Sequence, residues 1–232
     1  MDKTILIHGL NNPAGTREDA DLEPEVEPEV EPEVEPEEPR FNAATFFNEI
    51  RKTLFWGSLS QQQVDGFNAI GHYLPLFFPQ SDPVRIQKMA YCLATFQWET
   101  ASTMQPIEEY GGPNTRYAPW YGRGYVQLTW EENYEKQQDK LPRLMTELGI
   151  SPTVPYEVHD DKNLALHPDT SALISIGGMD GGDFTGKKLS DYIKPGSIDY
   201  VEARRIVNGT DEQHEIAEMA EKYESAIINA LA

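Results

Sequence analysis

The chain has 232 residues, 39% of them hydrophobic, which is enough for one ordinary globular domain with an appendage. Its formal net charge of -20 disfavours nucleic acid and anionic lipid surfaces as partners, because both would be repelled. A single cysteine, Cys92, excludes an internal disulfide, and its apolar neighbours in MAYCLATF predict a buried thiol.

The amino-terminal residues 1–16 carry a short apolar run, TILIHGL, of the length of one strand. It is too short for a secretory signal, and no run of about 18 apolar residues elsewhere could span a bilayer. We therefore expect no membrane insertion. The run is a strand that docks on the main body, a disordered segment, or an anchor that adds to the sheet edge of a partner.

Residues 17–40 form a repeat of Glu, Pro, Glu and Val. They hold 12 acidic residues against two arginines, a net of 2 - 12 = -10, so half of the formal charge lies here. Proline at every fourth position prevents a helix or a paired strand, and the repelling glutamates extend the chain. The segment is predicted to be a stiff, polyproline-like linker ahead of one domain over residues 41–232.

Helical patterns dominate that domain. Ser60 and Gln63 form the signature of a capping box ahead of a helix. The clearest helix lies over residues 84–99, where an apolar stripe predicts a place in the core; the stripe consists of Ile86, Met89, Leu93 and Phe96. Strand signals are few, so the fold is predicted to be mainly α.

The remaining elements are assigned in the same way. Residues 110–124 are rich in Gly, Pro, Asn and Tyr and are predicted to be a loop or an irregular hairpin. A helix over 129–150 has a possible break at Pro142, and residues 177–187 are predicted to be a loop. Thr210 and Gln213 predict a second capping box ahead of the last helix.

Three carboxylates are candidates for chemistry. Glu99 ends the 84–99 helix on its apolar line, and Glu108 and Glu109 follow in a loop beyond Pro106. One carboxylate on a rigid helix and a second on a nearby loop could flank a glycosidic bond, the first protonating the leaving oxygen and the second activating water. The pattern does not choose between Glu108 and Glu109.

A second cluster of candidates lies in YGRGYVQLTWEENY. Tyr125, Gln127 and Thr129 alternate with Val126 and Leu128, which predicts a short strand with the polar set on one face. Such side chains suit sugar hydroxyl and acetamido groups through hydrogen bonds and ring stacking. A buried polar network at the base of the loop is the alternative explanation.

These motifs together resemble glycoside hydrolase family 19, the chitinases and lysozyme-like endolysins of bacteriophages. The resemblance covers WET, then YGRGYVQLTWEENY, then RRIVNGT, in order over some 110 residues, and the phage-type branch is the more similar in LSQQQVDGFNAI, ETASTMQP and FTGKKLSDYI. It implies a lysozyme-like helical domain with a small irregular β-hairpin region beside the active-site cleft. It also implies that the substrate is the glycan of peptidoglycan.

The resemblance assigns roles residue by residue. Glu99 would be the general acid, Glu108 or Glu109 the base, and Thr129 would help to position the attacking water. The sugar would be held by Arg123, Tyr125, Gln127, Asn133 and Asn208. Cleavage would proceed by direct displacement with inversion, without a cofactor or a metal ion.

One position departs from the family pattern: residue 98 is Trp where the family usually has His. Our hypothesis is a phage or prophage peptidoglycan hydrolase. It would be made in the host bacterial cytoplasm and act on the cell wall after release or as part of a virion, with residues 1–40 as a possible attachment to a phage particle. The alternatives are a chitinase that cleaves N-acetylglucosamine polymers and a catalytically inactive glycan-binding or virion structural module.

Overall fold

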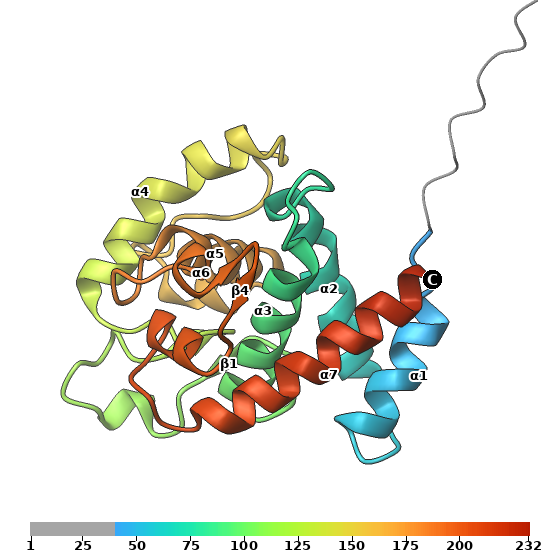
Figure 1. Cartoon of the computed structure of the whole chain (residues 1–232). Coiled ribbons are helices and arrows are strands. Elements are labelled where there is room, and N and C mark those ends of the chain that lie inside the picture. Colours follow the sequence, from blue (N-terminus) through green and yellow to red (C-terminus); the bar gives the residue numbers. More distant parts are fainter. Residues whose placement is uncertain (1–39) are drawn as a thin grey trace, which may run out of the picture. The chain divides into compact units, whose positions relative to one another are not determined.

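The computed structural model describes residues 40–232, so the predictions for residues 1–16 and for the linker up to residue 39 lie outside the described residues. Most of the described chain is helical (Figure 1). The helices are α1 (Ala43–Thr53), α2 (Gln61–Phe77), α3 (Arg85–Glu99), α4 (Glu131–Glu147), α5 (Pro168–Gly181), α6 (Leu189–Tyr192) and α7 (Gln213–Leu231). The 3-10 turns are η1 (Gly112–Asn114), η2 (Lys162–Leu166) and η3 (Glu202–Ile206).

The strands form two small antiparallel pairs. β1 (Ile107–Glu108) pairs with β2 (Arg123–Gly124), and β3 (Ile193–Lys194) pairs with β4 (Ser197–Ile198). This architecture confirms the prediction of a mainly helical domain with a small hairpin region.

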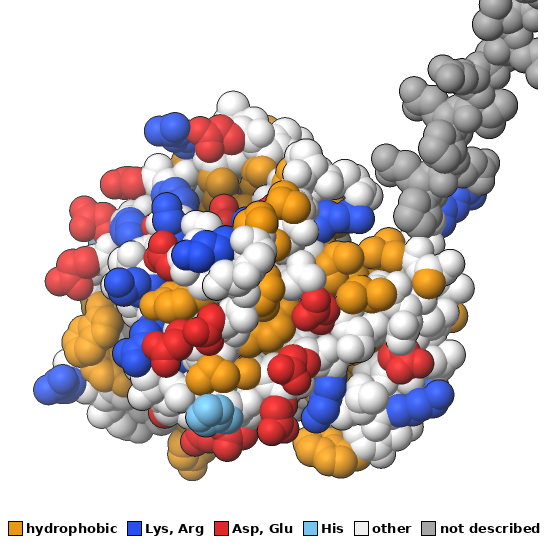
Figure 2. Space-filling view, in the orientation of Figure 1, with side chains coloured by type: hydrophobic (Ala, Val, Ile, Leu, Met, Phe, Trp, Pro, Cys, Tyr) orange, Lys and Arg blue, Asp and Glu red, His pale blue; other side chains and the backbone are white. Residues whose placement is uncertain are grey.

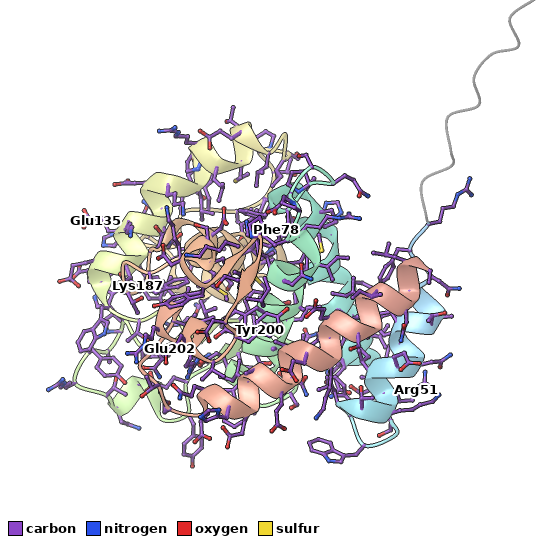
Figure 3. The ribbon with its side chains drawn as sticks, in the orientation of Figure 1. Arg51, Phe78, Glu135, Lys187, Tyr200 and Glu202 are labelled. Carbon is purple, nitrogen blue, oxygen red and sulfur yellow. The ribbon has the colours of Figure 1, made fainter. Side chains whose placement is uncertain are left out.

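Helix α3 is the central element of the core. Eight consecutive residues, Ala90 to Gln97, are buried, and a helix with no exposed face must be covered on every side. Helix α7 packs along it and α1 packs against α7 (Figure 1). Tyr200, labelled in Figure 3, stacks on Tyr91 of α3 and donates a hydrogen bond to Glu224 of α7. Helix α3, whose last residue is Glu99, is thus fixed in the core along its buried length.

One of the predicted helix features agrees with the structure and two do not. Ser60 forms the predicted capping box with Gln63 at the start of α2. The break considered at Pro142 is absent, because α4 continues through that residue. The capping box predicted at Thr210 was wrong, because α7 begins after Glu212 without a side-chain cap. The turn there is shaped instead by Arg204, whose Nε donates to the carbonyl of Asp211.

The loop predicted over residues 177–187 begins later than expected, because α5 extends to Gly181. The glycines at positions 177 and 178 therefore lie within α5, where they allow close packing. A Cβ at Gly178 would lie 2.2 Å from the ring of Phe184, and one at Gly177 would lie 2.9 Å from Leu144. The absence of side chains lets α4 and the returning loop approach α5, a tertiary reason that the sequence pattern does not reveal.

The surface differs from side to side. In Figure 2, acidic and basic side chains predominate over α4 at the left, whereas hydrophobic side chains gather near the carboxyl end of α7 at the right. Within residues 40–232, no helix is long and apolar enough to cross a membrane.

Asp183 joins α4 to the loop after α5. Its carboxylate accepts hydrogen bonds from Lys140 at 2.5 Å and from Gln137 at 3.1 Å, and Lys136 lies 3.1 Å away. Burial opposes the charged carboxylate, but the bonds from Lys140 and Gln137 outweigh it, so the pKa of Asp183 lies below its ordinary value.

We predict that Asp183→Asn lowers the free energy of unfolding at pH 7 by about 1.5–3 kcal/mol, the range for hydrogen bonds to charged groups. A carboxyl group whose pKa is lowered by folding stabilises the protein above its unfolded value, about 3.9. That stability is lost as the pH falls through the lower folded value. Urea unfolding of wild type and variant from pH 7 to pH 3 should show a difference that shrinks only below about pH 4. A constant difference would contradict this account.

Candidate functional site

Glu99 is the last residue of α3, and its side chain is only 16% exposed. Its Oε1 accepts a hydrogen bond at 2.5 Å from Nη1 of Arg204, a guanidinium that is itself 3% exposed. Arg204 belongs to η3, so the bond joins residues 105 positions apart. Glu99 therefore sits at the edge of the core with a fixed partner on one oxygen.

The chain turns sharply after Glu99. Ala101, Ser102 and Met104 all have positive φ, a rare backbone conformation for residues other than glycine. The turn is held against α2, where Gln63 donates to the carbonyl of Ser102 at 2.8 Å. Gly66 permits the approach, since a Cβ there would lie 1.8 Å from the carbonyl oxygen of Met104. Such strained turns persist only where the surrounding structure holds them.

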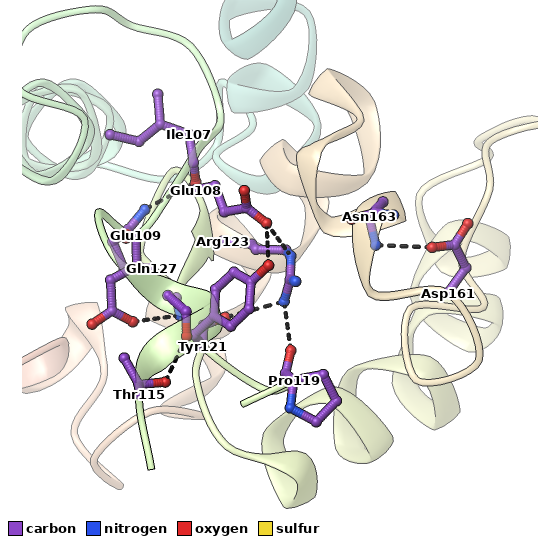
Figure 4. A network of polar contacts seen from close by, with 12 residues as sticks. Ile107, Glu108, Glu109, Thr115, Pro119, Tyr121, Arg123, Gln127, Asp161 and Asn163 are labelled. Atoms are coloured by element: carbon purple, nitrogen blue, oxygen red, sulfur yellow. Dashed lines mark hydrogen bonds and ion pairs between the residues drawn. The ribbon is translucent and has the colours of Figure 1, made fainter. Parts of the chain in front are cut away.

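That turn leads directly into β1, where Glu108 pairs across the strands with Arg123 (Figure 4). Oε1 of Glu108 accepts a hydrogen bond from Tyr121 at 2.6 Å and lies 3.3 Å from Nε of Arg123. Arg123 is buried, and its Nη1 donates to the carbonyl of Pro119 at 3.0 Å. The Glu108 side chain remains 42% exposed. It is thus an oriented carboxylate that still faces solvent.

Glu109 is held differently. Its Oε1 accepts from the Tyr117 hydroxyl at 2.7 Å, and its Oε2 accepts from the backbone N–H of Gly122 at 2.9 Å. Its own backbone N–H donates to the carbonyl of Gly122. Both carboxylate oxygens therefore fix the loop between β1 and β2.

Residues 123–128 form a tight turn rather than the predicted strand. Arg123 and Leu128 exchange backbone hydrogen bonds, and Gly124 and Gln127 both have positive φ. A Cβ at Gly124 would lie 2.6 Å from Oγ of Ser171, so this position needs glycine for space as well as for conformation. The alternation that predicted one polar face is lost in this turn.

Tyr125 is the residue most affected. Its side chain is fully buried, its ring stacks on Phe96 with centroids 5.5 Å apart, and burial raises the pKa of its hydroxyl. Its hydroxyl has no hydrogen-bond partner in the described part of the chain. A side chain in this position cannot stack on a sugar, so we leave Tyr125 out of the proposed binding set.

Gln127 and Thr129 serve the turn as well. The Gln127 amide donates to the carbonyls of Ile107 and Gly124, at 3.1 Å each, and so staples β1 to β2. Thr129 donates its hydroxyl proton to the carbonyl of Gln127 at 2.8 Å. The Asn133 amide donates to the carbonyl of Thr129 at 2.8 Å.

The backbone N–H of Asn208 donates to the carbonyl of Arg204. Asn208 is exposed, and its side-chain amide is 3.4 Å from Oδ2 of Asp211. The same Oδ2 lies 3.6 Å from Nη2 of Arg204. Arg204 is therefore placed between two carboxylates, Glu99 on α3 and Asp211 in the turn before α7.

Sequence reasoning missed Arg204, Tyr121 and Tyr117 as parts of this region. RRIVNGT was recognised as a motif, but nothing in it distinguishes the buried Arg204 from the exposed Arg205. The two tyrosines stand in an irregular stretch without periodicity. Their hydrogen bonds to Glu108 and Glu109 are the leading cause of the raised pKa of each phenol. Within residues 40–232, no group of three or more His, Cys, Asp or Glu side chains could hold a metal ion.

Comparison with solved structures finds similar chains at low sequence identity. Chitinase C from Streptomyces griseus HUT6037 is 18% identical, with a TM-score of 0.48 over 81% of this chain and 75% of that chain. A bacterial family 19 chitinase is 20% identical, with a TM-score of 0.43 over 81% of this chain and 93% of that chain. No family model and no curated protein matches the chain.

The two loop carboxylates should differ in their effect on stability. We predict that Glu109→Gln lowers the free energy of unfolding by about 1–3 kcal/mol, because an amide cannot accept on both sides from Tyr117 and Gly122. The matched change Glu108→Gln should cost less, since that side chain is exposed. Thermal and urea unfolding of the two variants tests the difference. Equal losses would contradict a supporting role for Glu109.

Proposed function

We propose that the chain is a glycan-cleaving hydrolase in which Glu99 is the general acid and Glu108 activates the attacking water. The observation that carries the proposal is the pair of differently held carboxylates on consecutive segments. Glu99 ends a rigid buried helix, and Glu108 lies nine residues later on a hairpin, partly exposed and oriented by Tyr121 and Arg123. One acid and one base in separate environments are what glycosidic cleavage with inversion requires.

Glu108 suits the role of base better than Glu109. A base must present a free lone pair to a water molecule. Both oxygens of Glu109 already accept hydrogen bonds, from Tyr117 and Gly122, whereas the known contacts of Glu108 converge on Oε1. The two adjacent residues thus divide into a reacting carboxylate and a loop-holding carboxylate.

The acid needs a way to change partner. A guanidinium partner suits a charged carboxylate, whereas a general acid must carry a proton. Asp211 offers Arg204 a second carboxylate 3.6 Å from its Nη2. In this proposal, a glycan that engages Asn208 draws Arg204 toward Asp211, and Glu99 then takes up a proton from solvent, which it donates to the leaving glycosidic oxygen.

The sugar would be held by exposed polar and aromatic groups near the hairpin. Of the predicted sugar contacts, Asn133 and Asn208 remain, since Arg123 is buried and the Gln127 amide joins β1 to β2. Thr129 keeps its predicted part in positioning the attacking water. Trp130 follows Thr129 with φ 74, and its exposed ring packs on Tyr117 with centroids 4.7 Å apart. A non-glycine residue in that conformation is strained, and strain of this kind concentrates at functional sites. Trp130 therefore offers a stacking surface for a sugar ring.

The substrate we favour is the glycan of bacterial peptidoglycan, because the motifs are most similar to those of the phage-type branch of family 19. On this proposal the protein is made in a host bacterium and reaches the wall after release or within a virion, where residues 1–40 would attach it to the particle. A chitinase is the second candidate. A catalytically silent glycan-binding module is the third, since Trp98 stands where the family usually has His.

Activity of matched variants tests the assignment. We predict that Glu99→Gln and Glu108→Gln each reduce the release of reducing ends from purified Gram-negative peptidoglycan by at least a hundredfold. Glu109→Gln should retain a measurable fraction of the wild-type activity, because Glu109 acts only by holding the loop between β1 and β2. Circular dichroism and thermal unfolding show whether each variant is folded.

Chitin oligomers assayed in parallel separate the substrates, and mass analysis of the fragments identifies the bond cleaved. Cleavage of chitin alone would favour the chitinase. Tight wall binding by wild type without released reducing ends would favour the silent module. Full activity of folded Glu99→Gln would refute the proposed mechanism.

The exchange of partners at Arg204 gives a separate prediction. Asp211→Asn should lower kcat about tenfold, an increase of roughly 1.4 kcal/mol in the barrier, with little change in KM. The reason is that Arg204 would lose the charged partner that draws it from Glu99. Glu215→Gln, in the first turn of α7, is the matched control. Equal kinetics of the two variants would show that Asp211 has no part in turnover.

A further inference from the structure

One cavity in the described part of the chain is apolar and distinct from the carboxylates. It has a volume of about 510 Å³ and lies among α1, α2, α3 and α7. Its walls include Phe41 before α1, Leu74 of α2, Met89 of α3 and Ile227 of α7. None of the candidate site residues lines it. Pockets of about 300–1,000 Å³ are the size that takes single small ligands.

The cavity accounts for a difference between prediction and structure on α3. The stripe formed by Ile86, Met89, Leu93 and Phe96 was expected to place the helix in the core. Leu93 and Phe96 are buried, but Ile86 and Met89 are only partly buried, because they face this opening. Phe41, which also lines the opening, is 50% exposed. An apolar surface of this kind gains free energy when a ligand removes it from water.

The polar groups around the cavity indicate the headgroup of the ligand. Arg85 is the one charged side chain in its lining. Within residues 40–232 its guanidinium has no ion pair, whereas the nearby Lys88 is paired with Asp82 at 2.7 Å. A guanidinium beside an apolar cavity favours a carboxylate on an apolar chain, because it adds a charge-assisted hydrogen bond to the burial of the chain.

The walls argue against an extended peptide in the cavity. They are helices, whose backbone N–H and C=O groups already bond within each helix. A peptide strand would find no backbone partners there and would bury its own amides unpaired, which is unfavourable. An alkyl chain has no such groups to satisfy.

We propose that this cavity is a binding site for a single long-chain carboxylate, with the alkyl chain between α1, α2, α3 and α7 and the carboxylate on Arg85. The site is separate from the proposed glycan chemistry and does not depend on it.

Gly71 provides a variant that blocks the cavity. It lines the wall, and a Cβ built on it meets no atom within 4 Å. Gly71→Phe therefore adds a side chain in open space, and replacing an exposed helical glycine does not disfavour the helix. Arg85→Gln removes the charge, and Arg51→Gln, on α1 and outside the cavity lining, is its matched control (Figure 3).

The test is calorimetric titration of the full chain with palmitate and with hexadecanol, below their aggregation concentrations. Wild type and Arg51→Gln should bind palmitate at one site per chain. Arg85→Gln should bind palmitate about tenfold more weakly with unchanged affinity for hexadecanol, and Gly71→Phe should bind neither. Thermal unfolding shows that each variant is folded.

Three results would overturn the proposal. They are no binding of palmitate by wild type, equal binding by folded Gly71→Phe, and equal loss of palmitate and hexadecanol affinity in Arg85→Gln. Sedimentation of the unliganded chain tests whether a second copy of the chain occupies the cavity. Dimers that form in wild type and are absent in Gly71→Phe would assign the cavity to a second copy of the chain instead.

Discussion

The contact between Glu99 and the buried Arg204 is the interaction on which the candidate site depends. Arg204 is almost fully removed from water, and a buried charge without a partner is costly. Glu99 and Asp211 supply the compensating oxygens. The same need fixes three elements at one point, the end of α3, the turn η3 and the start of α7. The geometry of the candidate site and the packing of the domain are therefore coupled through one side chain.

In the hairpin, the second carboxylate, Glu108, also lies beside a buried guanidinium. Arg123 is buried beneath it, and its guanidinium is shared among Glu108 and the carbonyls of Pro119 and Tyr121. Tyr134 donates to the Tyr121 carbonyl from α4 and so ties the hairpin to the helical body. A two-residue strand pair would be marginal alone, and these bonds give it a defined shape. Glu108 gains its orientation from this framework, while its exposure leaves it accessible.

The two ends of α3 have different chemical character. Its carboxyl end presents Glu99 to a polar region built from loops, and its amino-terminal half lines an apolar cavity with Arg85 at the edge. The buried middle of the helix separates them. Glycine residues serve close approach in both α2 and α5, where Gly66 admits the turn after Glu99 and Gly178 admits Phe184.

The sequence by itself determined the local elements. Apolar spacing of three and four residues predicted α3, Ser60 and Gln63 predicted the start of α2, and the order of motifs selected Glu99 and the pair Glu108 and Glu109. These signals involve residues that are close together in the sequence, so they can be recognised without knowledge of the fold. Only the tertiary structure separated Glu108 from Glu109, buried Tyr125, and brought Arg204 to Glu99 across 105 residues. Those outcomes depend on which polar groups lose water together, and that is decided by packing between distant segments.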